Sequence, residues 1–173
     1  MNPSNIIYGA FLLVAVLGVA VHLAISRHSL SPHRFAEIVL VWTFAVLVGV
    51  PGLFSGMYHV FDPQLAAAAI GWQVSPFQRE VGFADLGVGV LGVLAVRLRG
   101  LFWWATGIWS VMFFGGAAVG HLIEQQTTGN FAPGNAGVVF WLDIVVPVLL
   151  IVLLPVYQWA HGRPVAYPSA QAA

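Results

Sequence analysis

GWQVSPFQREVGFADLGVG, residues 71–89, begins like a capped helix and then carries Arg79, Glu80 and Asp85 into an otherwise apolar run. The chain around it has 173 residues, of which 60% are hydrophobic and only 7% are charged. This composition is far too apolar for a soluble globular domain. We therefore expect a membrane protein, and two carboxylates inside a membrane helix need an explanation.

The charge balance and the lack of cysteine narrow the chemistry. The six basic and six acidic residues cancel, so no charged surface for nucleic acid or acidic substrates is expected. The absence of Cys excludes disulfides, thiolate nucleophiles and thiolate metal sites. Histidine and the carboxylates remain as the strong ligands.

Apolar runs of about 20 residues, the length that a bilayer core demands, predict five transmembrane helices. They lie at residues 6–26, 35–61, 76–96, 101–125 and 137–159. The expected fold class is an all-α integral membrane protein, a five-helix bundle in which residues 1–163 form a single domain. Residues 164–173 are expected to be a disordered tail.

Local signals mark several helix starts. Ser31 and Ser75 each place a capping hydroxyl before a proline, and Gln78 would complete a capping box with Ser75. Asp62 is expected to cap a short interfacial helix in DPQLAAAAIGW, residues 62–72.

Glycine spacing predicts close helix packing. The second predicted span should also kink near Pro51, which is flanked by Gly49 and Gly52. The spacings expected to pack helices are Gly52 with Gly56, Gly116 with Gly120, and the run Gly82, Gly89 and Gly92.

Arginine placement predicts the orientation. The connections after the first and third spans, and the segment after the fifth, carry Arg27, Arg34, Arg97, Arg99 and Arg163. The opposite side holds only Arg79. The N-terminus should therefore face out and the C-terminus in, in what we expect to be a bacterial inner (plasma) membrane.

Polar residues from four predicted spans converge on the outer half of the bilayer. At about 1.5 Å of rise per residue, Asp85 lies about 13 Å and Asp143 about 10 Å below the outer ends of their helices. Buried carboxylates at such depth need polar partners. The expected members of this polar pocket are Glu80, Asp85, His121, Asp143, His59 and Glu124.

His121 and Glu124 are three residues apart, the spacing with which one helix presents two ligands to an ion in carboxylate-bridged bundles. The possible metal ligands are therefore His121, Glu124, Glu80, Asp143 and His59. This oxygen-rich set with two imidazoles suits iron, manganese, zinc or copper, and a proton or a quinone headgroup could use the same groups.

Simpler interpretations compete with a functional one. The whole cluster could be a structural hydrogen-bond network. Glu37 is expected to interact either with the N-terminus of the second span or with Arg34. Asp62 is expected to act only as a cap, and His22 to be a packing histidine. Glu80, His59 and Glu124 lie near enough to water to need no role.

Residues 35–124 resemble the DoxX-like superfamily of small membrane proteins. The resemblance rests on EVGFADLGVGVLGVLAVRLR, residues 80–99, and on GGAAVGHLIE, residues 115–124. It implies a helical bundle of the kind found in quinone-linked or thiol-linked redox systems, with no catalytic residue to transfer. The fifth predicted span and the absence of Cys depart from that pattern, and an uncharacterised bacterial membrane family is the nearest kinship expected.

Three functions from different classes follow. The first is a membrane oxidoreductase component whose polar pocket binds a divalent transition metal or a quinone. The second is a packing or assembly subunit, with a membrane-protein partner or a second copy of the chain docked in the bilayer. The third is a small proton-coupled carrier. It ranks lower because no inverted repeat, which is common in transporters, is evident.

Overall fold

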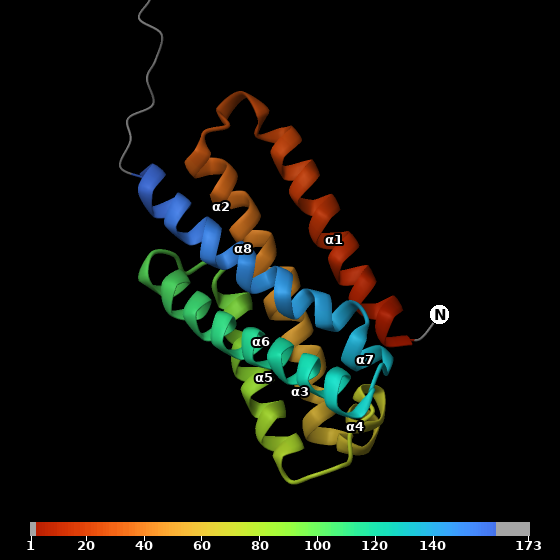
Figure 1. Ribbon diagram of the computed structural model, residues 1–173. Coiled ribbons are helices and arrows are strands. Elements are labelled where there is room, and N and C mark those ends of the chain that lie inside the picture. The colour runs from red at the N-terminus through yellow and green to blue at the C-terminus, as the bar shows by residue number, and fades with distance from the viewer. Residues whose placement is uncertain (1–2, 162–173) are drawn as a thin grey trace, which may run out of the picture.

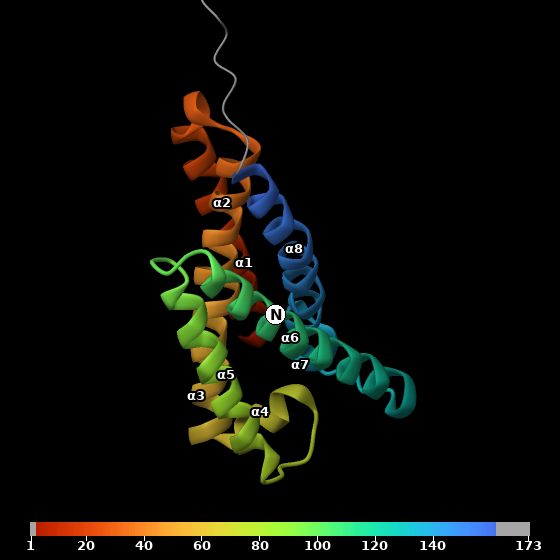
Figure 2. The ribbon, with the colours of Figure 1, turned by 90° about the vertical axis from the view of Figure 1, so that its left-hand side faces the viewer.

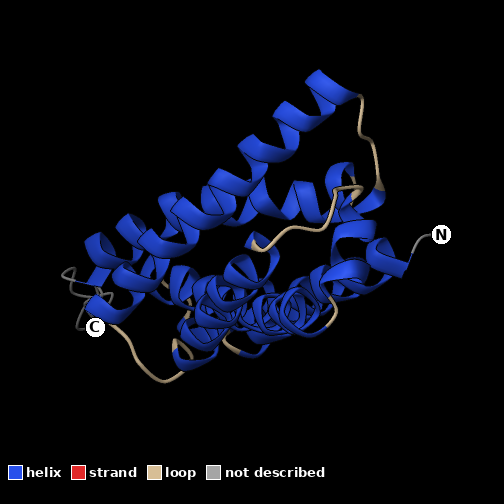
Figure 3. Ribbon diagram, turned by 90° about the horizontal axis from the view of Figure 1, so that it is seen from below, coloured by secondary structure: helices blue, strands red, loops and turns tan. Residues whose placement is uncertain are grey.

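In the computed structural model, which describes residues 3–161, all regular secondary structure is helical (Figure 1). In chain order the elements are α1 (Pro3–Ile25), η1 (Arg27–Ser29), α2 (Pro32–Trp42), η2 (Thr43–Gly49), α3 (Val50–Phe61), α4 (Pro63–Ile70), α5 (Phe77–Leu94), α6 (Leu101–Thr128), α7 (Pro133–Ala136) and α8 (Val138–His161). Short loops join them (Figure 3). The predicted tail at residues 164–173 and Arg163 lie outside the described residues.

Four helical segments are long and apolar enough to cross a membrane. They are Pro3–Ile25, Pro32–Phe61, Leu101–Thr128 and Pro133–Ala160. The remaining predicted span corresponds to α5, which carries Arg79, Glu80 and Asp85 within its 18 residues and is not among the four. The all-helical, membrane-type fold is confirmed, whereas the fifth crossing and the orientation stay predictions.

Two of the three predicted helix caps are present. The side chains of Ser31 and Asp62 each accept a hydrogen bond from the backbone N–H three residues later, at 3.1 Å. The capping box of Ser75 and Gln78 is wrong, because no side chain caps the start of α5. Gln78 is buried, and its amide side chain bonds to His59 of α3 instead.

The second predicted span contains a helical irregularity beside Pro51. Residues 43–49 are π-helical, and the regular α-helix α3 resumes at Val50. Proline lacks an N–H for the carbonyl four residues earlier, and its ring crowds that carbonyl. A local widening of the helix relieves this conflict.

Glycines bring the backbones of α3 and α5 into contact. A methyl group placed on Gly56 would lie 2.7 Å from the carbonyl oxygen of Gly82, and one on Gly89 would lie 2.5 Å from the backbone nitrogen of Leu53. Similar contacts confirm the predicted packing role of Gly52 and Gly82, and Gly92 packs in the same way against the backbone of η2. This close approach sets which side chains of the two helices can meet.

The same prediction is wrong for α6. Methyl groups on Gly116 and Gly120 would meet nothing within 4 Å, and both residues line a cavity. Figure 2 shows α6 leaning away from α3 and α5 toward its C-terminal end. Gly116 and Gly120 therefore leave room for a cavity and do not form a helix interface.

Polar contacts tie the helices together at the ends of the fold. At one end, the Asn5 side chain of α1 accepts a hydrogen bond from the backbone of Val138 at 3.0 Å. At the other, Glu37 binds Arg34 at 2.6 Å, as predicted, and also Arg99 at 2.9 Å. The apolar core between them contains Phe44, Val88, Trp103, Val146 and Leu150.

Candidate functional site

A cavity of about 730 Å³ lies beside α4, between α1, α3, α5, α6 and α8. Most of its wall is apolar. Its polar and ionisable wall residues include Tyr8, Ser55, His59, Gln78, Asp85, His121 and Asp143, and the Trp72 ring forms part of the wall. We call this space the polar cavity.

The α3–α5 contact supplies one side of the polar cavity. Ser55 and His59 are four residues apart on α3, and Gln78 and Asp85 are seven apart on α5, so each pair shares one helical face. The Ser55 hydroxyl donates to a carboxylate oxygen of Asp85 at 2.9 Å. His59 Nδ1 lies 2.6 Å from the side-chain oxygen of Gln78. The packing glycines therefore support two polar pairs, of which the His59–Gln78 pair is buried and the Ser55–Asp85 pair is partly buried.

A buried asparagine fixes His121 on the opposite side. His121 Nδ1 lies 2.6 Å from Oδ1 of Asn135, a residue of α7 with no exposed surface. The side-chain nitrogen Nδ2 of Asn135 donates to the backbone carbonyl of Asn130 at 2.7 Å. The Gln125 side chain donates to the backbone carbonyl of Asn135 at 2.8 Å. This orientation makes Oδ1 the acceptor, so His121 carries a hydrogen on Nδ1.

His121 Nε2 faces Asp143 at 3.6 Å, and both side chains are less than a tenth exposed. A neutral imidazole with its hydrogen on Nδ1 would point a lone pair at the carboxylate, which also carries lone pairs. The pair is stabilised when it holds one further proton, either on Nε2 or on the Asp143 carboxyl. The geometry therefore places an imidazole nitrogen and a carboxyl group face to face at the cavity wall.

Asp85 is a second buried carboxylate of the same cavity. Tyr8 of α1 and Ser55 of α3 line the cavity beside Asp85 and Asp143. Two like charges in a poorly solvated space disfavour each other. Proton uptake at one carboxylate should therefore depend on the state of the other.

Four of the six residues predicted for the pocket line this cavity, namely His59, Asp85, His121 and Asp143. Glu80 is exposed on α5 and is not a wall residue. Glu124 is half-buried outside the cavity, where it accepts a hydrogen bond from the Thr128 hydroxyl at 2.8 Å. Both glutamates lie on other faces of their helices.

The possible metal ligands His121, Glu124, Glu80, Asp143 and His59 do not come together as one site. Among the described residues, no three His, Cys, Asp or Glu side chains are grouped so that they could hold an ion. His121 directs Nδ1 to Asn135, and Glu124 turns to Thr128, so their spacing of three residues does not create a shared site. The geometry gives the metal interpretation no support.

Several residues of the site were missed by the sequence reasoning: Tyr8 and Ser55 line the cavity, and Asn135 lies behind His121. Tyr8, Ser55 and Asn135 have ordinary interpretations as a membrane-interface, packing or turn residue. A usable signal existed for Ser55, which lies one helical turn before His59. Trp72, expected only at the membrane interface, lies with its ring centre 5.6 Å from that of His121.

Comparison with known families matches residues 5–163 to the family of unknown function DUF6790. The chain belongs to that family. Neither a curated protein nor a solved structure gives a match. Because the family has no described activity, the functional argument rests on the polar cavity.

Proposed function

We propose that the protein is a membrane component that binds the headgroup of a quinone-like molecule in the polar cavity and exchanges protons with it. The observation that carries this proposal is the meeting of Asp85, Asp143 and His121 in one mostly apolar cavity. Its volume of about 730 Å³ falls within the roughly 300–1,000 Å³ typical of small-molecule sites.

The chemistry of a quinone fits the two kinds of wall. Its ring and tail need apolar surroundings, and its two carbonyl oxygens need hydrogen-bond donors. The Ser55–Asp85 pair lies on the α3–α5 side and the His121–Asp143 pair on the α6–α8 side. Each pair offers a proton-bearing group to one end of the ring.

Reduction of a quinone takes up two electrons and two protons. The carboxylates and the imidazole are groups that can hold the protons. The electrons would come from a redox partner protein, because the chain contains no Cys and the described residues group no metal ligands. The role proposed for this chain is therefore binding and proton exchange within an oxidoreductase system.

The proposed architecture is five crossings with the N-terminus out, in a bacterial plasma membrane. Support for the fifth crossing comes from α5, which packs along α3 through glycines and buries Asp85 on that face. The resemblance to DoxX-like proteins is a further proposal and agrees with a quinone-linked role. The polar cavity would then open in the outer half of the bilayer.

A binding measurement with decylubiquinone, a short-chain benzoquinone, tests the proposal. Quenching of tryptophan fluorescence in purified protein reports occupancy, because Trp72 lines the cavity. Asp143→Asn and Asp85→Asn keep the side-chain shape, and each should weaken binding roughly tenfold, the effect of one lost charge-assisted hydrogen bond. Glu80→Gln and Glu124→Gln are matched controls outside the cavity and should bind normally. Unchanged binding in a folded Asp143→Asn variant contradicts the proposal.

A second candidate function is that of an assembly subunit. It is favoured by α1, because only 6% of its apolar stretch is buried inside the chain and the rest is free to contact another protein. However, Gly52, Gly56, Gly82 and Gly89, which could pack against a partner helix, already pack α3 against α5. This function predicts copurification with a larger complex and loss of the fold, not of quinone binding alone, when Asp85 or Asp143 is replaced.

A further inference from the structure

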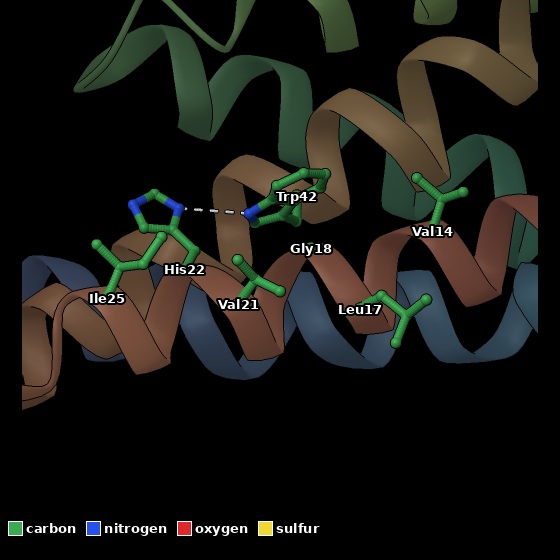
Figure 4. A pocket seen from close by; sticks show the side chains of 7 residues that line it. All are labelled: Val14, Leu17, Gly18, Val21, His22, Ile25 and Trp42. Carbon is green, nitrogen blue, oxygen red and sulfur yellow. Dashed lines mark hydrogen bonds between the residues drawn. The ribbon is translucent and has the colours of Figure 1, made fainter.

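A groove separate from the polar cavity runs along the outside of α1 and α2. Val14, Leu17, Val21 and Ile25 of α1 form its wall together with Trp42 of α2, and its volume is about 470 Å³. Its surface is almost wholly apolar, and the four α1 side chains are largely exposed. Figure 4 shows these side chains lying along one stretch of α1, with His22 and Ile25 at the same end.

Gly18 shapes the groove. A methyl group on Gly18 would lie 2.4 Å from the Trp42 ring, so the indole packs directly on the α1 backbone. Any side chain at this position would displace the indole. Gly18 and Trp42 thus form an apolar recess between α1 and α2.

The polar end of the groove has more hydrogen-bond donors than acceptors. Trp42 Nε1 points to His22 Nδ1 at 3.4 Å, as Figure 4 shows, and Arg34 Nη2 lies 3.3 Å from His22 Nε2. A neutral imidazole has a single acceptor nitrogen, so it can satisfy only one of these two donors. Within the described residues, this cluster is short of one acceptor.

The same end carries excess positive charge. Glu37 is shared between Arg34 and Arg99, so these three side chains together carry one net positive charge. Arg27 and Arg97 lie in the adjoining connections, and residues 26–37 and 95–100 contain no acid besides Glu37. The Arg34 side chain is 37% exposed and can reach a ligand from outside.

We propose that this groove binds one anionic phospholipid, with an acyl chain along α1 and the phosphate at Arg34. A phosphate oxygen would supply the missing acceptor and neutralise the shared positive charge. A zwitterionic lipid brings its own cation and gains less from this end, and free phosphate cannot use the apolar wall. The site is distinct from the polar cavity and does not depend on the proposed function.

Lipid retention by the full-length protein tests this site. Protein is exchanged into mixed micelles containing equal amounts of phosphatidylglycerol and phosphatidylcholine, and bound lipids are counted by native mass spectrometry. The unaltered chain should retain one phosphatidylglycerol in preference to phosphatidylcholine. Arg34→Gln should lower that preference roughly fivefold, the effect of removing one arginine from an anionic lipid surface. Arg79→Gln, which removes an exposed arginine of α5, is the charge control and should retain it.

A second pair of variants tests the apolar wall. Val21→Trp should fill the groove from its exposed edge and remove the retained lipid without disturbing Gly18. Gly9→Ala is the control, because a methyl group there meets nothing within 4 Å and Gly9 is not a groove residue. Equal retention of both lipids, an equal loss in Arg79→Gln, or a dimer that Val21→Trp dissociates would each overturn the proposal.

Discussion

His121 Nε2 lies 3.6 Å from a carboxylate oxygen of Asp143, while Nδ1 of the same ring is 2.6 Å from Asn135. The first distance is too long for a hydrogen bond and short enough for an ion pair. The second fixes the ring orientation and places a hydrogen on Nδ1. The buried asparagine therefore determines what His121 can offer to Asp143 and to the cavity.

Replacing Asn135 by Ala should release His121 from this orientation. Asn135 is fully buried and makes side-chain contacts with His121 and Asn130, so its loss should destabilise the fold by about 1–3 kcal/mol. Nitrogen NMR of histidine-labelled protein should show a protonated Nδ1 at His121 in the unaltered chain and a mixture of tautomers in the variant. Gln126→Ala, an exposed change on α6, is the control. An unprotonated Nδ1 in the unaltered chain would contradict the tautomer assigned to His121.

Adding one methyl group at the α3–α5 contact should be costly. Gly89→Ala places a methyl group 2.5 Å from the backbone of Leu53, and backbone atoms cannot move aside as a flexible side chain can. The expected loss of unfolding free energy is about 1–3 kcal/mol, measured by reversible unfolding in mixed detergents.

Gly87→Ala is the matched control on the same helix, since a methyl group there meets nothing within 4 Å. Alanine favours helix more than glycine does, so this variant should gain up to about 1 kcal/mol. Equal effects of the two variants would show that α3 and α5 do not touch through their glycines.

The predicted orientation can be tested with single cysteines, because the chain has none of its own. Thr127→Cys at the end of α6 and Ser29→Cys after α1 are both exposed and lie on opposite sides of the proposed bundle. A membrane-impermeant maleimide added to intact cells should label Thr127→Cys and leave Ser29→Cys unlabelled until the cells are opened. The reverse labelling pattern would contradict the predicted orientation and place the N-terminus on the inner side of the membrane.

The sequence predicts elements well where the signal is local. Runs of apolar residues identified the four long helices, and Ser31 and Asp62 marked starts because a cap needs only its own next turn. The sequence also predicts that His59, Asp85, His121 and Asp143 lie at similar depth, and these four residues line one cavity in the structure.

What the sequence could not supply was the rotation of each helix. The position of Gln78 in the sequence fits a capping box with Ser75, yet its side chain forms a hydrogen bond with His59 of α3. The pair Gly116 and Gly120 has the same spacing as Gly52 and Gly56, but spacing alone cannot distinguish a helix interface from a cavity wall. Glu124 lies three residues after His121, yet its carboxylate accepts a hydrogen bond from the Thr128 hydroxyl. A spacing of three residues is therefore not enough to predict a metal site.

The shared carboxylate of Glu37 should make a small, salt-sensitive contribution to stability. Glu37→Gln leaves Arg34 and Arg99 without their common partner, and the Glu37 side chain is still 20% exposed. Because exposed ion pairs are weak, the expected loss of unfolding free energy is about 1 kcal/mol or less. Added salt should screen the pairs and reduce the difference between variant and unaltered chain. Glu80→Gln, an exposed acid that forms no ion pair among the described residues, should show neither effect. A loss that is independent of salt would mean that Glu37 acts through packing and not through charge.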